Sequence, residues 1–141
     1  MKDSLKAGLE STLQFLIPET KTVPCLYPEV AEFRIMPRVF ATGYLVGLVE
    51  WACMRALQPH LDLPREFTVG TEVRLTHEAA TPPGLTATVR TRLEKIEGRR
   101  LFFSVTVHDG VEMICRGTHE RFVIDVARFQ EKLARKAPTS A

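Results

Sequence analysis

The longest apolar stretch of the chain predicts a buried helix from Ala41 to about Leu57. Its sequence, TGYLVGLVEWACMRAL, is hydrophobic on nearly every side, which is typical of a helix enclosed in a core rather than one on a surface. Thr42 is a suitable N-cap residue for this helix. Gly43 and Gly47, four residues apart, allow another segment of backbone to approach it closely.

Downstream of this helix, apolar residues recur at every second position, which is the spacing of β-strands. One predicted strand places six residues on a single face: Phe67, Val69, Thr71, Val73, Leu75 and His77. Further strands are expected from Leu85, from Leu101 and from Val111 to about Asp125. The dipeptides Glu97-Gly98 and Asp109-Gly110 are hairpin signals between them.

The remaining segments complete the predicted order of elements. Ser11 to Ile17 reads as a first strand, and the proline-punctuated stretch from Pro18 to Pro37 suits a loop or short helix. The tail carries Val126, Phe129 and Leu133 at helical spacing. A curved antiparallel sheet wrapped around the buried helix satisfies this order with short connections. We therefore expect one α+β domain, residues 1–141, with the hotdog fold.

Such a sheet leaves an edge strand open, so a homodimer that pairs edges, or a higher homo-oligomer, is expected. The composition, with 45% hydrophobic and 26% charged residues, is that of an ordinary globular protein. The net charge of +2, with both signs interspersed, disfavours nucleic-acid and membrane partners. Three widely separated cysteines fit a reducing compartment, so we expect a soluble cytoplasmic protein.

Glu50 is the most informative single residue, because it is the only charge between Arg38 and Arg55 in a segment that otherwise reads as core. A buried carboxylate is costly unless it is hydrogen-bonded, paired or facing a cleft. A structural role with a backbone or arginine partner and a functional role are about equally supported.

His77 and Thr42 each have an ordinary structural interpretation as well as a functional one. His77 stands where the strand pattern predicts an aliphatic residue, and taken alone it reads as a half-buried histidine satisfied by a neighbour. Thr42 reads as a helix cap. The start of a buried helix also offers free N–H groups and a positive dipole end, which could hold a thioester carbonyl, and Gly43 keeps that approach open.

Other kinds of site are disfavoured by spacing. No two histidines have the spacing of a metal pair, so no metal site is expected. His60, His108 and His119 have weaker claims to function than His77. Cys53 lies in the buried helix without an evident base and reads as a core residue.

The distance along the helix limits how Thr42 and Glu50 can act together. They are eight residues apart, which is about 12 Å in a regular helix. Two side chains in one straight helix cannot hydrogen-bond over that distance. We therefore favour a site at a dimer interface.

Five blocks of sequence resemble the fluoroacetyl-CoA thioesterase group of hotdog proteins. They are VFATGYLVGLVEWACMRAL, THEAATPPGLTATV, EGRRL, HDGV and GTHER, and they run in order from about Tyr27 to beyond Arg121. The resemblance implies a homodimeric enzyme that cleaves acyl-CoA to a carboxylate and coenzyme A. Coenzyme A is part of the substrate, and no separate cofactor is implied.

The resemblance also implies site residues. The family's catalytic threonine, glutamate and histidine fall on Thr42, Glu50 and His77. Residues associated with substrate binding fall on Gly70 and Arg121, and the aromatic lid corresponds to the stretch around Phe33 and Met36. Met36 stands where the fluoroacetate enzyme has a second lid phenylalanine, and a flexible methionine cannot form the same rigid wall.

These observations together predict hydrolysis of a short or small acyl-CoA, with the acyl group left open. Arg121 is a candidate for contact with coenzyme A phosphates, whereas Arg99 and Arg100 read as solvated surface charge. Two alternatives remain: an acyl-CoA hydratase or dehydratase on the same fold, and a non-catalytic acyl-CoA-binding module.

Overall fold

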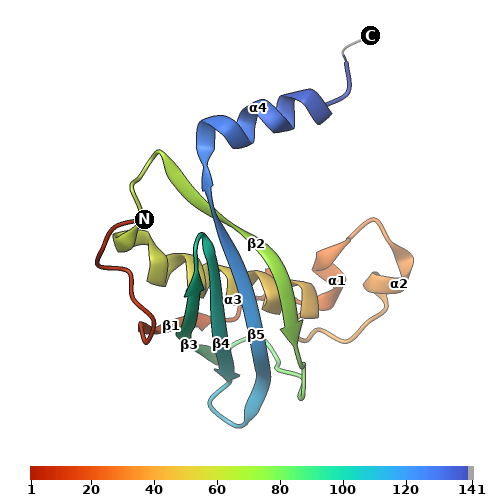
Figure 1. Cartoon of the computed structure of the whole chain (residues 1–141). Helices are drawn as coiled ribbons and strands as arrows, with labels where there is room; N and C mark the ends of the chain where they lie inside the picture. Colours follow the sequence, from red (N-terminus) through yellow and green to blue (C-terminus); the bar gives the residue numbers. More distant parts are fainter. Residues whose placement is uncertain (140–141) are drawn as a thin grey trace.

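A computed structural model describes residues 1–139 and has the predicted hotdog arrangement, an antiparallel sheet curved around one long helix (Figure 1). The strands are β1 (Glu10–Leu16), β2 (Glu66–Leu75), β3 (Thr86–Glu97), β4 (Arg100–His108) and β5 (Met113–Asp125). The sheet order is β1-β3-β4-β5-β2, so β1 and β2 are its edges. The helices are α1 (Val23–Leu26), α2 (Ala31–Arg34), α3 (Thr42–Leu57) and α4 (Val126–Lys136), with 3-10 turns at Glu19–Lys21 and Gln58–His60.

The two hairpin signals lie at the predicted turns. Gly98, between β3 and β4, has φ 61°, and Gly110, between β4 and β5, has φ 90°. Glycine adopts these positive φ values without the steric cost that a side chain would add. The tight turns make β3, β4 and β5 neighbours in the sheet, as the sequence pattern predicts.

The helix α3 packs one side on the sheet and leaves another side exposed. Leu45, Val49 and Leu57 are at most 1% exposed in the core, whereas Trp51 is 38% and Met54 47% exposed. The prediction of a helix buried all round is therefore wrong for the isolated chain, because a single sheet can cover only one side of a helix. None of the helices within residues 1–139 combines the length and apolar character that spanning a membrane requires.

The first turn of α3 also differs from the prediction. The N-cap residue is Ala41, not Thr42, and no side chain caps this end of the helix. Thr42 is the first helical residue, so its hydroxyl group is not engaged in capping.

A bulge in β2 changes which of its residues face α3. Gly70 pairs with Arg121 but Glu72 pairs with Glu120, so Thr71 is an extra residue in the strand. An extra residue reverses the alternation of faces beyond it. The predicted single face from Phe67 to His77 is therefore wrong: buried Thr68 precedes the bulge on the α3 side, and Phe67 is 46% exposed.

The helix α4 extends from the end of β5 and projects away from the sheet (Figure 1). The side chain of Asp125 caps it by accepting a hydrogen bond from the backbone N–H of Arg128 at 3.1 Å. None of its residues is buried, and Phe129 and Leu133 are 38% and 55% exposed. The chain alone thus leaves an apolar surface beside the open edge at β2.

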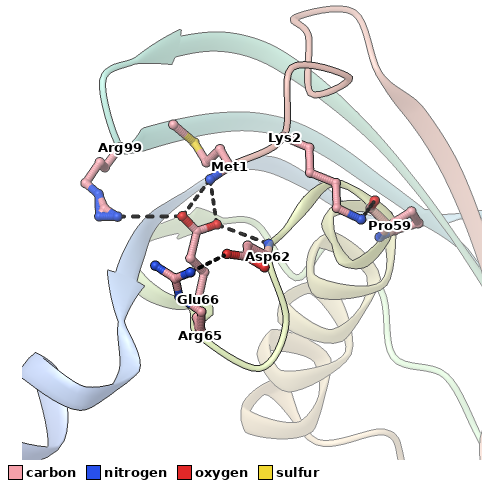
Figure 2. A network of polar contacts seen from close by, with 7 residues as sticks. All are labelled: Met1, Lys2, Pro59, Asp62, Arg65, Glu66 and Arg99. Carbon is pink, nitrogen blue, oxygen red and sulfur yellow. Dashed lines mark hydrogen bonds and ion pairs between the residues drawn. The ribbon is translucent and has the colours of Figure 1, made fainter.

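The start of β2 is held by a cluster of polar contacts around Glu66 (Figure 2). The amino group of Met1 lies 2.6 Å from both carboxylate oxygens, and the backbone N–H of Asp62 donates to Oε2 at 3.2 Å. Arg99 Nη2, from the turn between β3 and β4, is 3.8 Å from Oε1. These contacts join the first residue, the loop after α3 and a hairpin turn to one edge strand.

Replacing Glu66 by Gln should destabilise the fold by about 1.5–3 kcal/mol at pH 7, the usual contribution of hydrogen bonds to charged groups. The amino group of Met1, the Asp62 N–H and Arg99 hold the pKa of Glu66 below its usual value against the opposing effect of burial. The stabilisation is therefore present above the unfolded-state pKa of about 4.3 and is lost as pH falls through the lower folded-state pKa. Thermal unfolding followed by circular dichroism should show the two proteins converging in acid. A difference in Tm that is independent of pH would contradict this account.

Candidate functional site

Thr42 and His77 form a hydrogen-bonded pair at the start of α3. Thr42 Oγ1 lies 2.7 Å from His77 Nδ1. His77 is two residues beyond the end of β2, and backbone bonds on either side hold it in place: Thr76 N–H to Arg116 O at 2.9 Å and Glu78 N–H to Ile114 O at 2.7 Å. The extension of strand pairing beyond β2 thus brings the histidine to the helix terminus.

The surroundings of His77 favour its neutral form. Burial lowers the pKa of His77 below its usual value. A neutral imidazole has one nitrogen that accepts and one that donates a hydrogen bond. When Nδ1 accepts from the Thr42 hydroxyl, Nε2 carries the hydrogen, and this buried atom has no hydrogen-bond partner among residues 1–139. The pair is therefore arranged as a hydroxyl next to a base, with the far side of the base unsatisfied.

The amide groups at the start of α3 lie beside this pair. The first helical amides have no carbonyl four residues earlier within the helix, and Ala41 has no side chain that could cap them. Gly43 is exposed, and a Cβ atom there would lie 3.0 Å from Leu26 Cδ2 in α1. The absence of a side chain at Gly43 lets α1 pack against the helix terminus.

Glu50 lies two turns further along α3, in a second group of polar residues. Glu50 Oε2 accepts a hydrogen bond from Arg121 Nη1 at 3.1 Å, and the side chains of Glu50 and Arg121 are 39% and 3% exposed. A Cβ atom at Gly70 would lie 2.8 Å from Glu50 Oε2. Glycine at this position leaves room for the carboxylate against β2, so the carboxylate is both paired and open to solvent.

The guanidinium group of Arg121 is held from several sides. Nε donates to Thr68 Oγ1 and Nη2 to the backbone oxygen of Thr68, each at 2.8 Å, and Nη1 lies 3.0 Å from His119 Nε2. Cys53 is close to the same charges, but burial raises the pKa of its thiol to about 12. Cys53 is therefore a neutral core thiol, in line with the sequence interpretation.

The three candidate catalytic residues are thus divided between two groups in one chain. Thr42 bonds to His77, Glu50 bonds to Arg121, and no hydrogen bond joins the two groups within residues 1–139. This separation agrees with the length of helix between Thr42 and Glu50, about 12 Å. The structure of one chain does not assemble all three residues.

The residues expected in the lid lie in and after α2. The Phe33 ring packs on Tyr27 with 5.5 Å between ring centroids, whereas Met36 is 46% exposed. A role for Phe33 and Met36 in shaping the acyl pocket remains a prediction. Arg99 and Arg100 form surface ion pairs, with Glu66 at 3.8 Å and with Glu120 at 2.8 Å, respectively.

Sequence reasoning missed two members of the Arg121 group, Thr68 and His119. His119 lies within the polar run HER, which gives it a weaker claim than His77 in the sequence, yet it is only 1% exposed. The available signal was the alternation in β5, which places His119, Arg121 and Val123 on one face. Val123 is fully buried, so the two polar residues share the core side of the strand.

Comparison with known proteins identifies the family. The model of the fluoroacetyl-CoA-specific thioesterase family matches residues 27–127. The fluoroacetyl-CoA thioesterase of Streptantibioticus cattleyicolor is 52% identical over 138 residues, covering 98% of this chain and 99% of that protein. The range matched by the family model, residues 27–127, spans the positions of both polar groups described above.

Solved structures agree with this result. A variant of the fluoroacetyl-CoA thioesterase FlK in complex with acetyl-CoA superimposes with a TM-score of 0.92 at 51% identity, covering 95% of this chain and 100% of that one. A thioesterase superfamily member from Thermus thermophilus gives a TM-score of 0.83 at 25% identity, covering 94% and 93%. The chain therefore belongs to the fluoroacetyl-CoA-specific thioesterase family and is a thioester hydrolase.

Proposed function

We propose that the protein hydrolyses a small acyl-CoA to a carboxylate and coenzyme A, at sites that two copies of the chain build together. The observation that carries the proposal is the 2.7 Å bond between Thr42 Oγ1 and His77 Nδ1 beside the uncapped start of α3. A hydroxyl, a base and free amide groups in one place are the components of acyl transfer.

The first half of the reaction uses this end of the helix. The thioester carbonyl accepts hydrogen bonds from the first amides of α3, with the positive end of the helix dipole behind them. Thr42 Oγ attacks the carbonyl carbon while its proton passes to His77 Nδ1. The C–S bond then breaks, and the leaving thiolate takes that proton, so that an acyl ester on Thr42 and free coenzyme A result.

The second half requires an activated water molecule. Glu50 accepts a proton from water as the water oxygen attacks the acyl ester. The ester C–O bond then breaks, the proton passes from Glu50 to Thr42 Oγ1, and the acid leaves and ionises to the carboxylate. Arg121 holds the Glu50 side chain in place through the contact at 3.1 Å. Four of the N–H groups of Arg121 already have partners. Arg121 is therefore better suited to positioning Glu50 beside the acyl group than to binding the coenzyme A phosphates.

A second copy of the chain would bring Glu50 to the Thr42–His77 pair. The isolated chain leaves β2 as an open edge, the Nε2 atom of His77 without a partner, and Glu50 partly exposed. Pairing of two β2 strands around a two-fold axis covers the open β2 edge of each chain with that of the other. The Glu50 of one chain would then serve the Thr42–His77 pair of the other.

The acyl group is proposed to be small, because variants of the related enzyme FlK have been solved with acetyl-CoA and with fluoroacetate and coenzyme A. Met36 provides a softer lid than a phenylalanine ring, so the acetyl and fluoroacetyl groups should be distinguished less sharply here. The proposed location is the cytoplasm, a reducing compartment that suits the three free cysteines of the chain.

Purified protein should release free thiol from small acyl-CoA substrates, with kcat/KM falling as the acyl chain is lengthened. The measurement is a continuous thiol-capture assay over acetyl, fluoroacetyl, butyryl and octanoyl thioesters. Crotonyl-CoA, followed by loss of enoyl absorbance, serves as the control for hydratase chemistry. Loss of that absorbance without thiol release from any substrate would refute hydrolysis.

A further inference from the structure

His119 lies on the side of β5 that faces the core, and both of its ring nitrogens have hydrogen-bond partners. Its Nδ1 atom is 2.8 Å from the backbone oxygen of Glu72, just beyond the bulge in β2, and its Nε2 atom is 3.0 Å from Arg121 Nη1. The side chain is only 1% exposed. This histidine does more than pack in the core, because one ring nitrogen faces a group that can only accept a hydrogen bond and the other faces a group that can only donate one.

These two partners determine the protonation state of the ring. A carbonyl oxygen can only accept, so Nδ1 must carry a hydrogen. A guanidinium nitrogen can only donate, so Nε2 must present its lone pair. The structure therefore specifies one neutral tautomer, with the hydrogen on Nδ1.

The lone pair on Nε2 helps to orient the arginine that faces Glu50. Arg121 Nη1 has two hydrogens, of which one is directed to His119 Nε2 and the other to Glu50 Oε2. Nε and Nη2 are held by Thr68. If His119 did not accept, Nη1 would lose one of the two bonds that fix its plane, and the position of the carboxylate would be less well defined.

We propose that His119 is a positioning residue for hydrolysis: as the neutral Nδ1–H tautomer it fixes Arg121, which in turn holds the Glu50 carboxylate against Gly70. This inference rests on the proposed function of Glu50. His119 itself does not touch the substrate, since Arg121 stands between His119 and the carboxylate in the chain of bonds.

Protonation of His119 would disable this arrangement. An added hydrogen on Nε2 would point at Arg121 Nη1 and place two positive charges about 3 Å apart, a contact strongly disfavoured in a low-dielectric interior. The charged groups around the ring are Arg121 and Glu120 from β5 and Glu50 from α3. From β2, Glu72 contributes the hydrogen bond to its backbone carbonyl. Burial is the largest effect and lowers the pKa of His119; the charge of Arg121 acts in the same direction, and the contacts with Glu72, Glu50 and Glu120 oppose it.

The sign of the pH dependence follows from this direction. The unfolded chain binds a proton at His119 below about pH 6.5, whereas the folded chain does so only at lower pH. The contribution of neutral His119 to stability is therefore complete above about pH 6.5 and declines as pH falls towards the folded-state pKa. The positioning of Glu50 fails only when the folded protein takes up the proton.

The test compares two replacements of His119 with different hydrogen-bonding ability. His119→Leu removes the acceptor and should lower kcat about 10-fold to 100-fold with little change in KM, by analogy with the loss of groups that orient metal ligands. His119→Gln can offer an amide oxygen to Arg121 and should recover most of that loss. His108→Gln, at an exposed hairpin histidine, is the matched control and should behave as wild type. Equal kcat in wild type and His119→Leu, or equal losses in His119→Leu and His119→Gln with unchanged Tm, would overturn the proposal.

A second measurement does not depend on activity. Protein labelled with 15N-histidine should show His119 as the neutral Nδ1–H tautomer at pH 7, and this signal should persist below about pH 6.5, the ordinary pKa of a histidine. An Nε2–H tautomer or a charged ring at pH 7 would refute the inference. A wild-type protein that has the expected tautomer but releases no thiol would instead refute the proposed function.

Discussion

Replacing Glu50 by Gln should reduce kcat for thioester hydrolysis by roughly 10²-fold to 10⁴-fold, the usual contribution of a general base. The amide oxygen can still accept the hydrogen bond that Arg121 Nη1 donates to Oε2 in the native protein at 3.1 Å. The variant should therefore keep its fold. An amide cannot take a proton from water, so the acyl ester on Thr42 would form but be hydrolysed slowly.

The acyl ester on Thr42 can also be detected directly. Mass spectrometry of Glu50→Gln after mixing with acetyl-CoA should detect protein carrying one acyl group, and the added Thr42→Ala substitution should abolish that species. Glu112→Gln, at an exposed position in the turn between β4 and β5, is the matched control and should retain full activity. Wild-type kcat in folded Glu50→Gln would exclude the carboxylate from the reaction.

A random mixture of Thr42→Ala and Glu50→Gln chains should regain about one quarter of the wild-type activity, and the mixed dimers purified from it about one half, although each variant alone is nearly inactive. With random pairing, half of the dimers contain one chain of each kind. If Thr42 of one chain works with Glu50 of the other, each mixed dimer has one intact site and one site with both substitutions. If each site instead used Thr42 and Glu50 of the same chain, every site in the mixed dimer would carry one substitution and none would be intact.

Two differently tagged chains, unfolded and refolded together and then purified on both tags, provide the mixed dimers for a thiol-release assay. Thr42→Ala chains paired with Thr42→Ala/Glu50→Gln chains are the control, because neither arrangement contains an intact site. Doubly tagged dimers that remain as inactive as this control would show that the site is not shared. A protein that is monomeric in solution while it hydrolyses acyl-CoA would contradict the proposed dimer.

The exposed surface of the single chain bears on the same question. Trp51 and Met54 on α3, Phe67 on β2 and Phe129 on α4 are each more than a third exposed, and all four line one open groove beside the β2 edge. Large apolar side chains gathered at an open edge strand are typical of a surface that a partner covers. The groove is thus consistent with the β2 pairing from which the mixed-dimer result is derived.

Much of the fold follows from local sequence patterns. The apolar run from Ala41 predicted α3, and alternation together with Glu97-Gly98 and Asp109-Gly110 predicted the hairpins of β3, β4 and β5. These signals are reliable because helix and strand periodicity and glycine turns depend on residues close together in the chain. The unusual carboxylate at Glu50 was also apparent from the sequence, since a charge within an apolar helix requires a partner.

Only the tertiary structure decided which partners those residues have. The bulge at Thr71 reverses the faces of β2, and a one-residue insertion leaves no clear mark on an alternating pattern. The same strand brings His77 to Thr42, and β5 brings Arg121 to Glu50, across 35 and 71 residues of sequence. Contacts over such separations depend on how the sheet closes around the helix, which no local pattern encodes. For that reason the sequence determined the elements and the candidate residues. The folded structure decided that Thr42 pairs with His77, that His119 supports Arg121, and that the two groups are separate within one chain.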